Sequence, residues 1–348
     1  MMPFLRFILI GLCLSVLTAC DNDPGARQAK FYAFGTEIDI SLYGVSEEEA
    51  SATVSSLEAS FADIDNTWHA WRPSTLSDIN QAISNNKSIL VTDDVAALIL
   101  LAKTLAQNSE HLFNPAAGKL FELWGFHQDD WFNSRSPPTQ NQLDSWLAKA
   151  PSMDALTIEN GQLTSDNDAV KLGFGGFAKG FAVDQAILVL QQQGIQNALV
   201  NIGGDLRAIG MHGKRPWVIG VRHPRQDGML ATIAIQGDES VFTSGDYERF
   251  FEYQGQRYPH ILDSRNGQPA NQATSVTVLH DNAAIADAAA TALFVAGQDW
   301  PRIAALMGIK YVMLVRPDGE IEISPDMIER VAFINHDAPA IVRPLSLT

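Results

Sequence analysis

A glycine-rich segment with one lysine stands near the middle of the chain, LGFGGFAKGFAVDQ at residues 172–185. Glycines let a backbone approach a ligand closely, and the first N–H groups of a helix attract anions. Lys179 lies where the following helix is expected to begin, a position that disfavours a cation unless an anion compensates it. The segment therefore predicts an anion site, although glycines needed only for tight helix packing are an alternative.

Two widespread glycine motifs do not account for this segment. Gly173, Gly175 and Ala178 match G-x-G-x-x-A, but that dinucleotide fingerprint belongs to the first strand–turn–helix of a βαβ array. Here the segment lies mid-chain and strand-like sequence follows it. A P-loop is excluded by residue order, because Lys179 precedes the final glycine, Gly180, instead of following it.

A carboxylate and a hydroxyl four residues apart form a second candidate site, in AAIADAAATALFVAG at residues 283–297. On a helix, Asp287 and Thr291 share one face, and the small alanines between them allow close approach. Mg²⁺ prefers such oxygen ligands and completes its shell with substrate phosphates. The pair alone could be a plain polar face, but together with the glycine–lysine segment it predicts a magnesium–diphosphate site.

The composition excludes one class of partner. The 348-residue chain is 46% hydrophobic and carries 24 Lys and Arg against 40 Asp and Glu, a net charge of −16. A folded protein with this charge repels a phosphate backbone, so we expect no nucleic-acid partner.

The N-terminus reads as a secretion signal. Arg6 precedes an apolar run, FILIGLCLSVL at 7–17, that is too short to span a bilayer. In LTAC, Cys20 lies where a lipoprotein signal places the acylated cysteine; an ordinary cleavage site that ends in Cys is the alternative. Asp21 resembles the residue that retains lipoproteins in the inner membrane, so we expect lipid anchoring there, on the periplasmic face. We predict a signal peptide at 1–19, a lipid-anchored tether at 20–30 and one domain at 31–340.

The elements around the two candidate sites indicate the fold class. Strand-like alternation at 30–44 is followed by a helix that Ser46 and Glu49 cap, and further helices are expected at 92–109, 177–193 and 283–296. Asn160–Gly161 predicts a hairpin. Between 198 and 280 several strands follow one another without helices, which favours an α+β fold over a doubly wound parallel sheet.

Several of these segments, taken in order, resemble the ApbE family, the FAD:protein FMN transferases. They are FNPAAGKLFELWGF, LGFGGFAKGFAVD, LVNIGGDLRAIG, FTSGDYERFFE, PHILDSRNGQP and ADAAATALFVAG, with AFGT at 33–36 as the opening strand. The resemblance covers residues 31 to about 300. It implies an ApbE-like, T-fold-related α+β fold of two lobes, with mainly antiparallel sheets flanked by helices and FAD in the cleft between the lobes.

The resemblance also implies a reaction and its site residues. A Ser or Thr hydroxyl of an acceptor flavoprotein attacks the FMN-side phosphorus of FAD, giving phosphoester-linked FMN and AMP. Mg²⁺ is implied as cofactor, on the side chains of Asp287 and Thr291 and the carbonyl of Gly176. His260 matches the catalytic base, a role that its ordinary pKa near 6.5 suits, and Asp287 is catalytic through the metal. The implied FAD-binding residues are Phe34, Asn114, Pro115, Ala116, Gly173, Lys179, Thr243, Ser244, Asp246 and Leu262.

The sequence departs from the family pattern at several positions. Gly173 and Asn114 stand where many members carry Asp, Phe34 where Met is common, and Ala290 lacks a carboxylate that some relatives have. Two alternatives therefore remain: a Mg²⁺-dependent FAD pyrophosphatase that yields FMN and AMP, and a non-catalytic FAD-binding lipoprotein. The acceptor implied for a transferase is a flavoprotein subunit of an inner-membrane redox complex of the Rnf, Nqr or NosR type.

Overall fold

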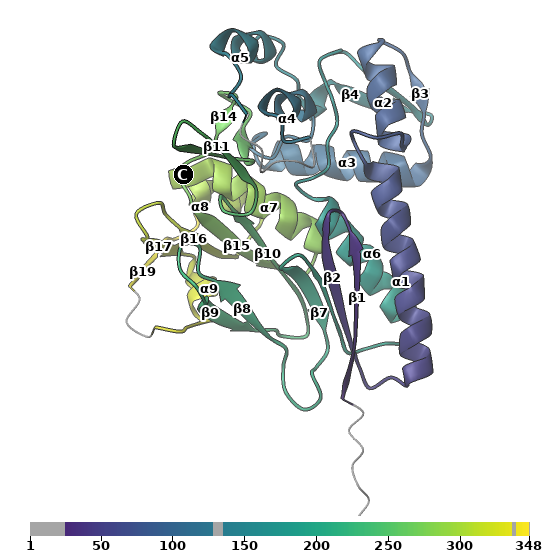
Figure 1. Cartoon of the computed structure of the whole chain (residues 1–348), viewed down its shortest axis with the longest axis vertical. Coiled ribbons are helices and arrows are strands. Elements are labelled where there is room, and N and C mark those ends of the chain that lie inside the picture. The colour runs from purple at the N-terminus through teal and green to yellow at the C-terminus, as the bar shows by residue number, and fades with distance from the viewer. Residues whose placement is uncertain (1–24, 128–134, 336–338, 348) are drawn as a thin grey trace, which may run out of the picture.

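One large sheet forms the centre of the protein (Figure 1). The structure is a computed structural model that describes residues 25–127, 135–335 and 339–347. Within these residues the sheet has nine strands, and every neighbouring pair is antiparallel except the last, which is parallel. In spatial order the strands are β1 (Ala26–Ala33), β2 (Thr36–Tyr43), β6 (Ala198–Ile202), β7 (Asp205–Ile209), β10 (Asp238–Gly245), β15 (Ser275–His280), β16 (Tyr311–Val315), β17 (Ile321–Ile323) and β19 (Ala340–Val342).

Helices cover one face of this sheet. Helix α6 packs on β6 and β7, α7 packs on β10 and β15, and α6 and α7 contact each other. The largest hydrophobic core lies between these helices and the sheet. The α-helices are α1 (Glu47–Trp68), α2 (Thr75–Ser84), α3 (Asp93–Asn108), α4 (Gly118–Trp124), α5 (Gln140–Leu147), α6 (Ala178–Gln192), α7 (Ala283–Ala296), α8 (Trp300–Met307) and α9 (Pro325–Ile328), with 3-10 turns η1 (Met153–Ala155) and η2 (Gly297–Asp299).

Smaller sheets complete the fold. One of them encloses a second core, whose side chains include Trp217, Ile233 and Met313. A third core joins α4 and α5 to β11 around Trp124 and Phe251. The small sheets are β18 (Val331–Phe333) with β9 (Met229–Ala234) and β8 (Val218–Arg222); β3 (Ile89–Leu90) with β5 (Gln162–Ser165) and β4 (Leu156–Glu159); β11 (Phe250–Tyr253) with β12 (Gln256–Pro259); and β13 (Leu262–Asp263) with β14 (Gln268–Pro269).

The α+β class and the mainly antiparallel sheets agree with the prediction. Local signals also hold: Ser46 and Glu49 form the expected capping box of α1, Asn160 and Gly161 turn between β4 and β5, and α7 spans 283–296 as expected. Five α-helices were not expected, namely α2, α4, α5, α8 and α9. The last four are only four to eight residues long, too short for a clear helical period.

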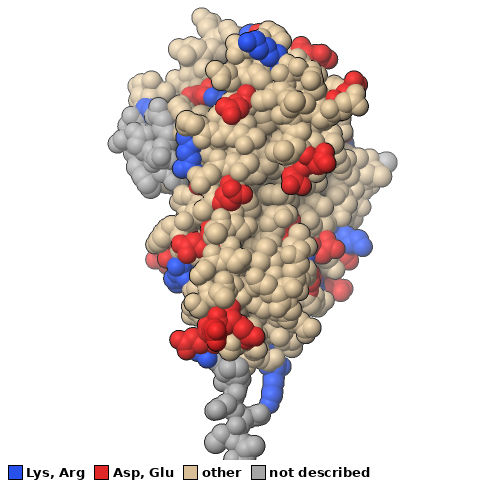
Figure 2. Space-filling model, turned by 90° about the vertical axis from the view of Figure 1, so that its right-hand side faces the viewer, with Lys and Arg blue, Asp and Glu red and all other residues tan. Residues whose placement is uncertain are grey.

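The N-terminal predictions fall largely beyond the described residues. The signal peptide at 1–19, Cys20 and Asp21 lie outside them. Strand β1 begins at Ala26, so it includes the end of the segment 20–30 that was expected to be a tether. Within the described part of the chain, no helix combines the length and apolar character needed to cross a bilayer. On the face shown in Figure 2, acidic side chains are spread over the surface, as the net charge of −16 leads one to expect.

Candidate functional site

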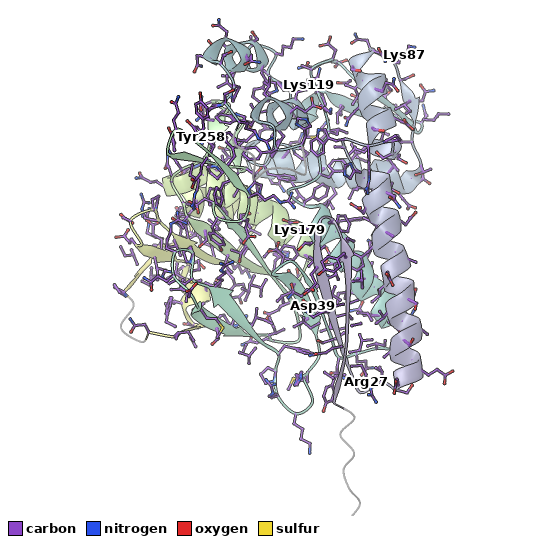
Figure 3. All side chains as sticks on the ribbon, viewed as in Figure 1. Arg27, Asp39, Lys87, Lys119, Lys179 and Tyr258 are labelled. Atoms are coloured by element: carbon purple, nitrogen blue, oxygen red, sulfur yellow. The ribbon has the colours of Figure 1, made fainter. Side chains whose placement is uncertain are left out.

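Buried aromatic rings fix the loop that leads into α6. Phe174 and Phe177 are both almost fully buried and pack edge-to-face at 5.1 Å between ring centroids. Phe113 packs against Phe177 at 5.7 Å, and Trp68 of α1 against Phe174 at 5.5 Å. The glycines thus lie in a loop that side chains from two other segments hold in place. This rigidity positions the first N–H groups of α6, where Lys179 lies (Figure 3).

The Lys179 ammonium is paired with the carboxylate of Asp205, at the start of β7. The other carboxylate oxygen of Asp205 accepts the backbone N–H of Thr243 at 2.8 Å. Burial disfavours the charged amine, but Asp205 and then Asp287 outweigh it, so the pKa of Lys179 is raised. Lys179 therefore remains a cation at the N-terminal end of α6, where it adds to the positive potential of the helix.

Asp287 of α7 points at that same helix end. Its Oδ2 accepts the backbone N–H of Gly180 at 3.0 Å, while no group of the described residues donates to its Oδ1. Burial raises the pKa of Asp287 to about 7; Lys179 opposes this rise and Asp205 adds to it. This carboxyl is thus buried with only one of its oxygens hydrogen-bonded, an arrangement that is common at functional sites.

Thr291 lies one turn further along α7, beside the loop. Its hydroxyl shares a hydrogen bond with the Ser244 hydroxyl at 3.3 Å. At Gly176 a Cβ would lie 3.5 Å from Thr291 Oγ1 and 3.3 Å from the Phe113 ring, so the loop backbone runs close to this hydroxyl. Thr243 faces another strand instead, where its hydroxyl bonds that of Thr277 at 2.9 Å.

These donors suit a small hard cation. Asp287 supplies a carboxylate oxygen without a hydrogen-bond donor, and Thr291 supplies a neutral oxygen on the same helix face. Mg²⁺ typically takes few protein oxygens and leaves positions for water and phosphate. Among the described residues no cluster of three or more His, Cys, Asp or Glu forms a metal cage. The set present fits a metal that shares its shell with a diphosphate.

His260 follows the β11–β12 hairpin and is half-buried. Its Nδ1 lies 3.1 Å from the carbonyl oxygen of Arg249. A carbonyl only accepts, so Nδ1 carries the proton and Nε2 keeps its lone pair. Burial and then the charge of Arg249 lower the pKa of His260 to about 3, with a further contribution from Lys179. The pKa of His260 thus lies below the ordinary value near 6.5 that the sequence prediction used, because the sequence did not show these neighbours.

A second group of predicted residues forms the wall beside the loop. Asn114 donates to the carbonyl of Pro151 at 3.1 Å and accepts the N–H of Ala116 at 3.1 Å. Pro115 accepts the N–H of Gly173 at 2.9 Å. A Cβ on Gly173 would meet its nearest atom, in Trp71, at 3.7 Å, which is ordinary contact. A Cβ therefore fits at this position without a shift of its neighbours.

Three other predicted FAD-binding residues, Phe34, Asp246 and Leu262, make their main contacts with residues other than Lys179, Asp287 and Thr291. Phe34 has a φ of 53° in the turn between β1 and β2, and its ring packs on Phe61. Asp246 is engaged by Arg225 through two hydrogen bonds of 2.7 and 2.6 Å. Leu262 is buried in the third core.

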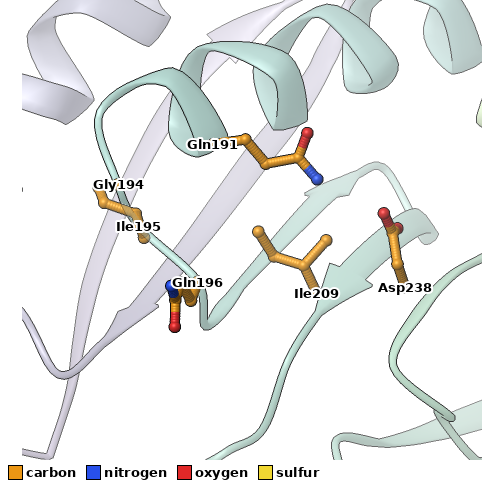
Figure 4. Close-up of a pocket in the computed structure, with 6 residues that line it drawn as sticks. All are labelled: Gln191, Gly194, Ile195, Gln196, Ile209 and Asp238. Carbon is orange, nitrogen blue, oxygen red and sulfur yellow. The ribbon is translucent and has the colours of Figure 1, made fainter.

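Two hollows on the described surface are lined by none of the predicted site residues. One, of about 350 Å³, lies at the far end of α6 and is lined by Gln191, Gly194, Ile195, Gln196, Ile209 and Asp238 (Figure 4). The other, of about 440 Å³, lies against α4 and α5, beside Lys119 and Trp146. Neither offers an alternative constellation of catalytic side chains.

Comparison with known proteins decides the family. The sequence profile of the ApbE family matches residues 34–313. This chain belongs to the ApbE family. The FAD:protein FMN transferase of Rhodobacter capsulatus is 40% identical over 337 residues, covering 95% of this chain but 63% of the relative. The FAD:protein FMN transferase of Vibrio cholerae serotype O1 is 34% identical over 251 residues, covering 71% of this chain and 74% of the relative.

Solved ApbE structures share the fold. The ApbE protein from Thermotoga maritima matches with a TM-score of 0.80 and 31% identity, over 88% of this chain and 99% of that one. The apo flavinyl transferase ApbE of Pseudomonas stutzeri matches with a TM-score of 0.72 and 26% identity, over 85% and 92%. The predicted family and fold are thus confirmed.

The sequence analysis missed two ApbE site neighbours. The first is Asp205, the ion-pair partner of Lys179. It lies in the segment NIGGD, which was part of the resemblance to the family, but no role was assigned to this aspartate. Gly180 is the second: a Cβ there would overlap the carbonyl oxygen of Ala283, so its role is the close crossing of α6 and α7. The packing alternative for the glycines therefore holds at Gly180, while Gly176 lies beside the Thr291 hydroxyl, a candidate metal donor.

Proposed function

We propose that this chain is a Mg²⁺-dependent FAD:protein FMN transferase. The observation that carries the proposal is the convergence of Lys179, Asp287 and Thr291 at the glycine loop of a chain that belongs to the ApbE family. The relatives named above carry the same activity in their names. One charged amine, a helix N-terminus and an oxygen donor pair together suit a diphosphate.

The loop and α6 would hold the diphosphate of FAD. The positive end of the α6 dipole and the Lys179 ammonium would supply positive potential on one side. Asp287 and Thr291, with the carbonyl of Gly176, would hold Mg²⁺ on the other. When bound there, Mg²⁺ would supply charge stabilisation for the phosphate oxygens. Phe34, Asn114, Pro115, Ala116, Gly173, Thr243, Ser244, Asp246 and Leu262 remain proposed FAD contacts, in the cleft between the lobes.

His260 would act on the acceptor. Its Nε2 is unprotonated and takes the proton of the acceptor Ser or Thr hydroxyl as that oxygen bonds to the FMN-side phosphorus. The bond between that phosphorus and the bridging oxygen breaks, and AMP leaves with the electron pair. The hydroxyl proton then resides on His260, and the products are phosphoester-linked FMN protein and AMP.

Incubation of the protein with FAD, Mg²⁺ and a candidate acceptor tests the proposal. We expect FMN attached to the acceptor by mass spectrometry, with AMP in equal amount. Free FMN with AMP would instead support the pyrophosphatase alternative, which the departures at Gly173 and Asn114 keep in view. Unchanged FAD would support a non-catalytic flavin carrier.

The location and the acceptor belong to the proposal too. The LTAC sequence at Cys20 and the following Asp21 support a lipid anchor in the inner membrane, with the domain on the periplasmic face. A flavoprotein subunit of an Rnf, Nqr or NosR type complex at the same membrane would then be within reach. Co-expression with such subunits, followed by mass spectrometry, identifies the acceptor.

A further inference from the structure

Helices α6 and α7 each carry an aspartate that accepts backbone N–H groups from the first turn of the other helix. Asp287 of α7 accepts the N–H of Gly180, in the first turn of α6, at 3.0 Å. In return, Asp184 of α6 accepts the N–H groups of Ala283 and Ala284, the first two residues of α7, at 2.9 and 3.0 Å. The absence of a side chain at Gly180 permits this close crossing. Each helix thus satisfies part of the other's first turn: Asp287 accepts one N–H of α6, and Asp184 accepts two N–H groups of α7.

Asp184 takes no part in the chemistry proposed above, yet its carboxylate is buried, with 8% of the residue exposed, and both of its oxygens accept hydrogen bonds. The Arg207 guanidinium pairs with the same carboxylate and also binds Asp238, at the start of β10, through hydrogen bonds of 2.7 and 2.9 Å. The chain of contacts therefore ties the first turn of α7 to two strands of the central sheet. Of Asp184, Arg207 and Asp238, Asp184 is the one that accepts hydrogen bonds from α7.

The position of α7 decides the geometry of the metal donors. Asp287 follows the Asp184-bound residues by one turn and Thr291 by two. Their partners belong to other elements: the N–H of Gly180 on α6 for Asp287, and the Ser244 hydroxyl on β10 for Thr291. A shift of α7 along its axis would move both donor oxygens away from those partners at once. Mg²⁺ demands nearly ideal octahedral geometry at about 2.0–2.1 Å, so it tolerates little of such movement.

We propose that Asp184 is a positioning residue for the metal site, because it fixes the start of the helix that carries Asp287 and Thr291. The inference rests on the proposed function, since it assumes that these two residues hold Mg²⁺. It assigns Asp184 to metal affinity and not to the transfer step itself. Outer partners of metal ligands typically change metal affinity by about 10- to 100-fold when removed.

Asp184→Asn tests this with little change in volume. An amide keeps one acceptor oxygen, but its NH₂ group cannot accept the second N–H of α7. We expect the Mg²⁺ concentration for half-maximal FAD binding, followed by flavin fluorescence, to rise about 10- to 100-fold. FAD affinity without metal should stay the same, and transfer at saturating Mg²⁺ should approach the wild-type rate. Ca²⁺, whose coordination is more flexible, should show a smaller rise.

Asp238→Asn is the matched control. It weakens the same Arg207 network but leaves both hydrogen bonds from α7 to Asp184 in place. Its Mg²⁺ requirement should equal that of the wild type. Equal Mg²⁺ requirements in Asp184→Asn and Asp238→Asn would overturn the proposal, as would loss of metal-free FAD binding in step with Mg²⁺ binding.

A second variant serves if Asp184→Asn does not fold. Ala283→Pro removes one of the two N–H donors at a helix position that favours proline, and it should raise the Mg²⁺ requirement in the same direction. An unchanged Mg²⁺ requirement in that variant would count against the positioning role of Asp184.

The binding measurement also separates this inference from the proposed function. A wild-type protein that fails to transfer FMN but binds FAD with Mg²⁺ still allows the Asp184 effect to be measured. FAD binding that ignores Mg²⁺ in the wild type overturns the inference.

Discussion

Lys179 and Asp205 form an ion pair at the point where α6 begins, and both side chains are largely withdrawn from solvent. The exposed fractions are 28% for the lysine side chain and 7% for the aspartate side chain. The pair holds the Lys179 ammonium at the N-terminus of α6, and the Asp205 carboxylate balances its charge. An anionic substrate can therefore meet Lys179 without the protein having buried a lone charge.

Asp205→Asn should destabilise the protein by leaving Lys179 without its counter-charge. Removal of one partner of a buried pair costs roughly 3 kcal/mol, and the double variant Lys179→Met/Asp205→Asn should recover part of this loss. Urea unfolding measures both. The control is Lys30→Met, which removes an exposed pair with Glu37 and Asp39 and should leave the free energy of unfolding nearly unchanged. A double variant no more stable than Asp205→Asn would contradict this account.

Gly180→Ala should separate α6 from α7, because its Cβ would overlap the carbonyl oxygen of Ala283. We expect a loss of about 1–3 kcal/mol in the free energy of unfolding, as in overpacked cores, together with a higher Mg²⁺ requirement. Gly175→Ala is the matched control from the same loop, since a Cβ there meets nothing within 4 Å. Equal stability of the two variants would show that the crossing does not need Gly180.

Local sequence signals predicted the elements that hold the site. The capping box at Ser46 and Glu49, the turn at Asn160 and the extent of α7 all depend on residues a few positions apart. The resemblance to the ApbE family brought the distant segments together. What the sequence could not show were contacts between segments: Asp205 on Lys179, Asp184 on the start of α7, and Arg249 beside His260. These depend on tertiary packing, and they are the contacts that set the charges of the site.

Asp287→Asn should lower Mg²⁺-dependent FAD turnover by orders of magnitude, because the leaving phosphate loses its charge stabilisation. Thr291→Val removes a neutral oxygen and should have a milder effect, while Thr291→Ser should keep most of the activity. The measurement is AMP release across a Mg²⁺ titration. Wild-type turnover in Asp287→Asn would remove Asp287 from the metal site.

Cys20→Ser should abolish acylation of the N-terminus, leaving either uncleaved precursor or protein released from the membrane. Palmitate labelling and membrane fractionation measure this, with Ser15→Ala, in the apolar segment, as a control that should be acylated normally. Palmitate labelling that persists in Cys20→Ser would refute the predicted lipid anchor.

His260→Ala should separate transfer from FAD binding. The acceptor hydroxyl is a poor nucleophile at neutral pH, so loss of a general base should slow flavinylation by about two to four orders of magnitude. In the proposed site the loop, Lys179 and Asp287 hold the diphosphate, so FAD affinity should change only a few-fold. Loss of FAD binding in step with activity would make His260 a binding residue instead.

The pH dependence gives the sharper test of the same role. The pKa of His260 is lowered to about 3, so the ring of the free protein is neutral and able to accept a proton at every pH above that value. Since kcat/KM reports the free enzyme, its dependence on His260 should show no acid limb between about pH 5 and 8. Saturating Mg²⁺ is needed in this measurement, because Mg²⁺ at the proposed site would keep Asp287 deprotonated. In the complex, the negative diphosphate counters Arg249 and Lys179 and raises the pKa of His260, so kcat should fall at a higher pH than kcat/KM. An acid limb of kcat/KM near pH 6.5 that His260→Gln abolishes would show that Arg249 and burial do not control this histidine.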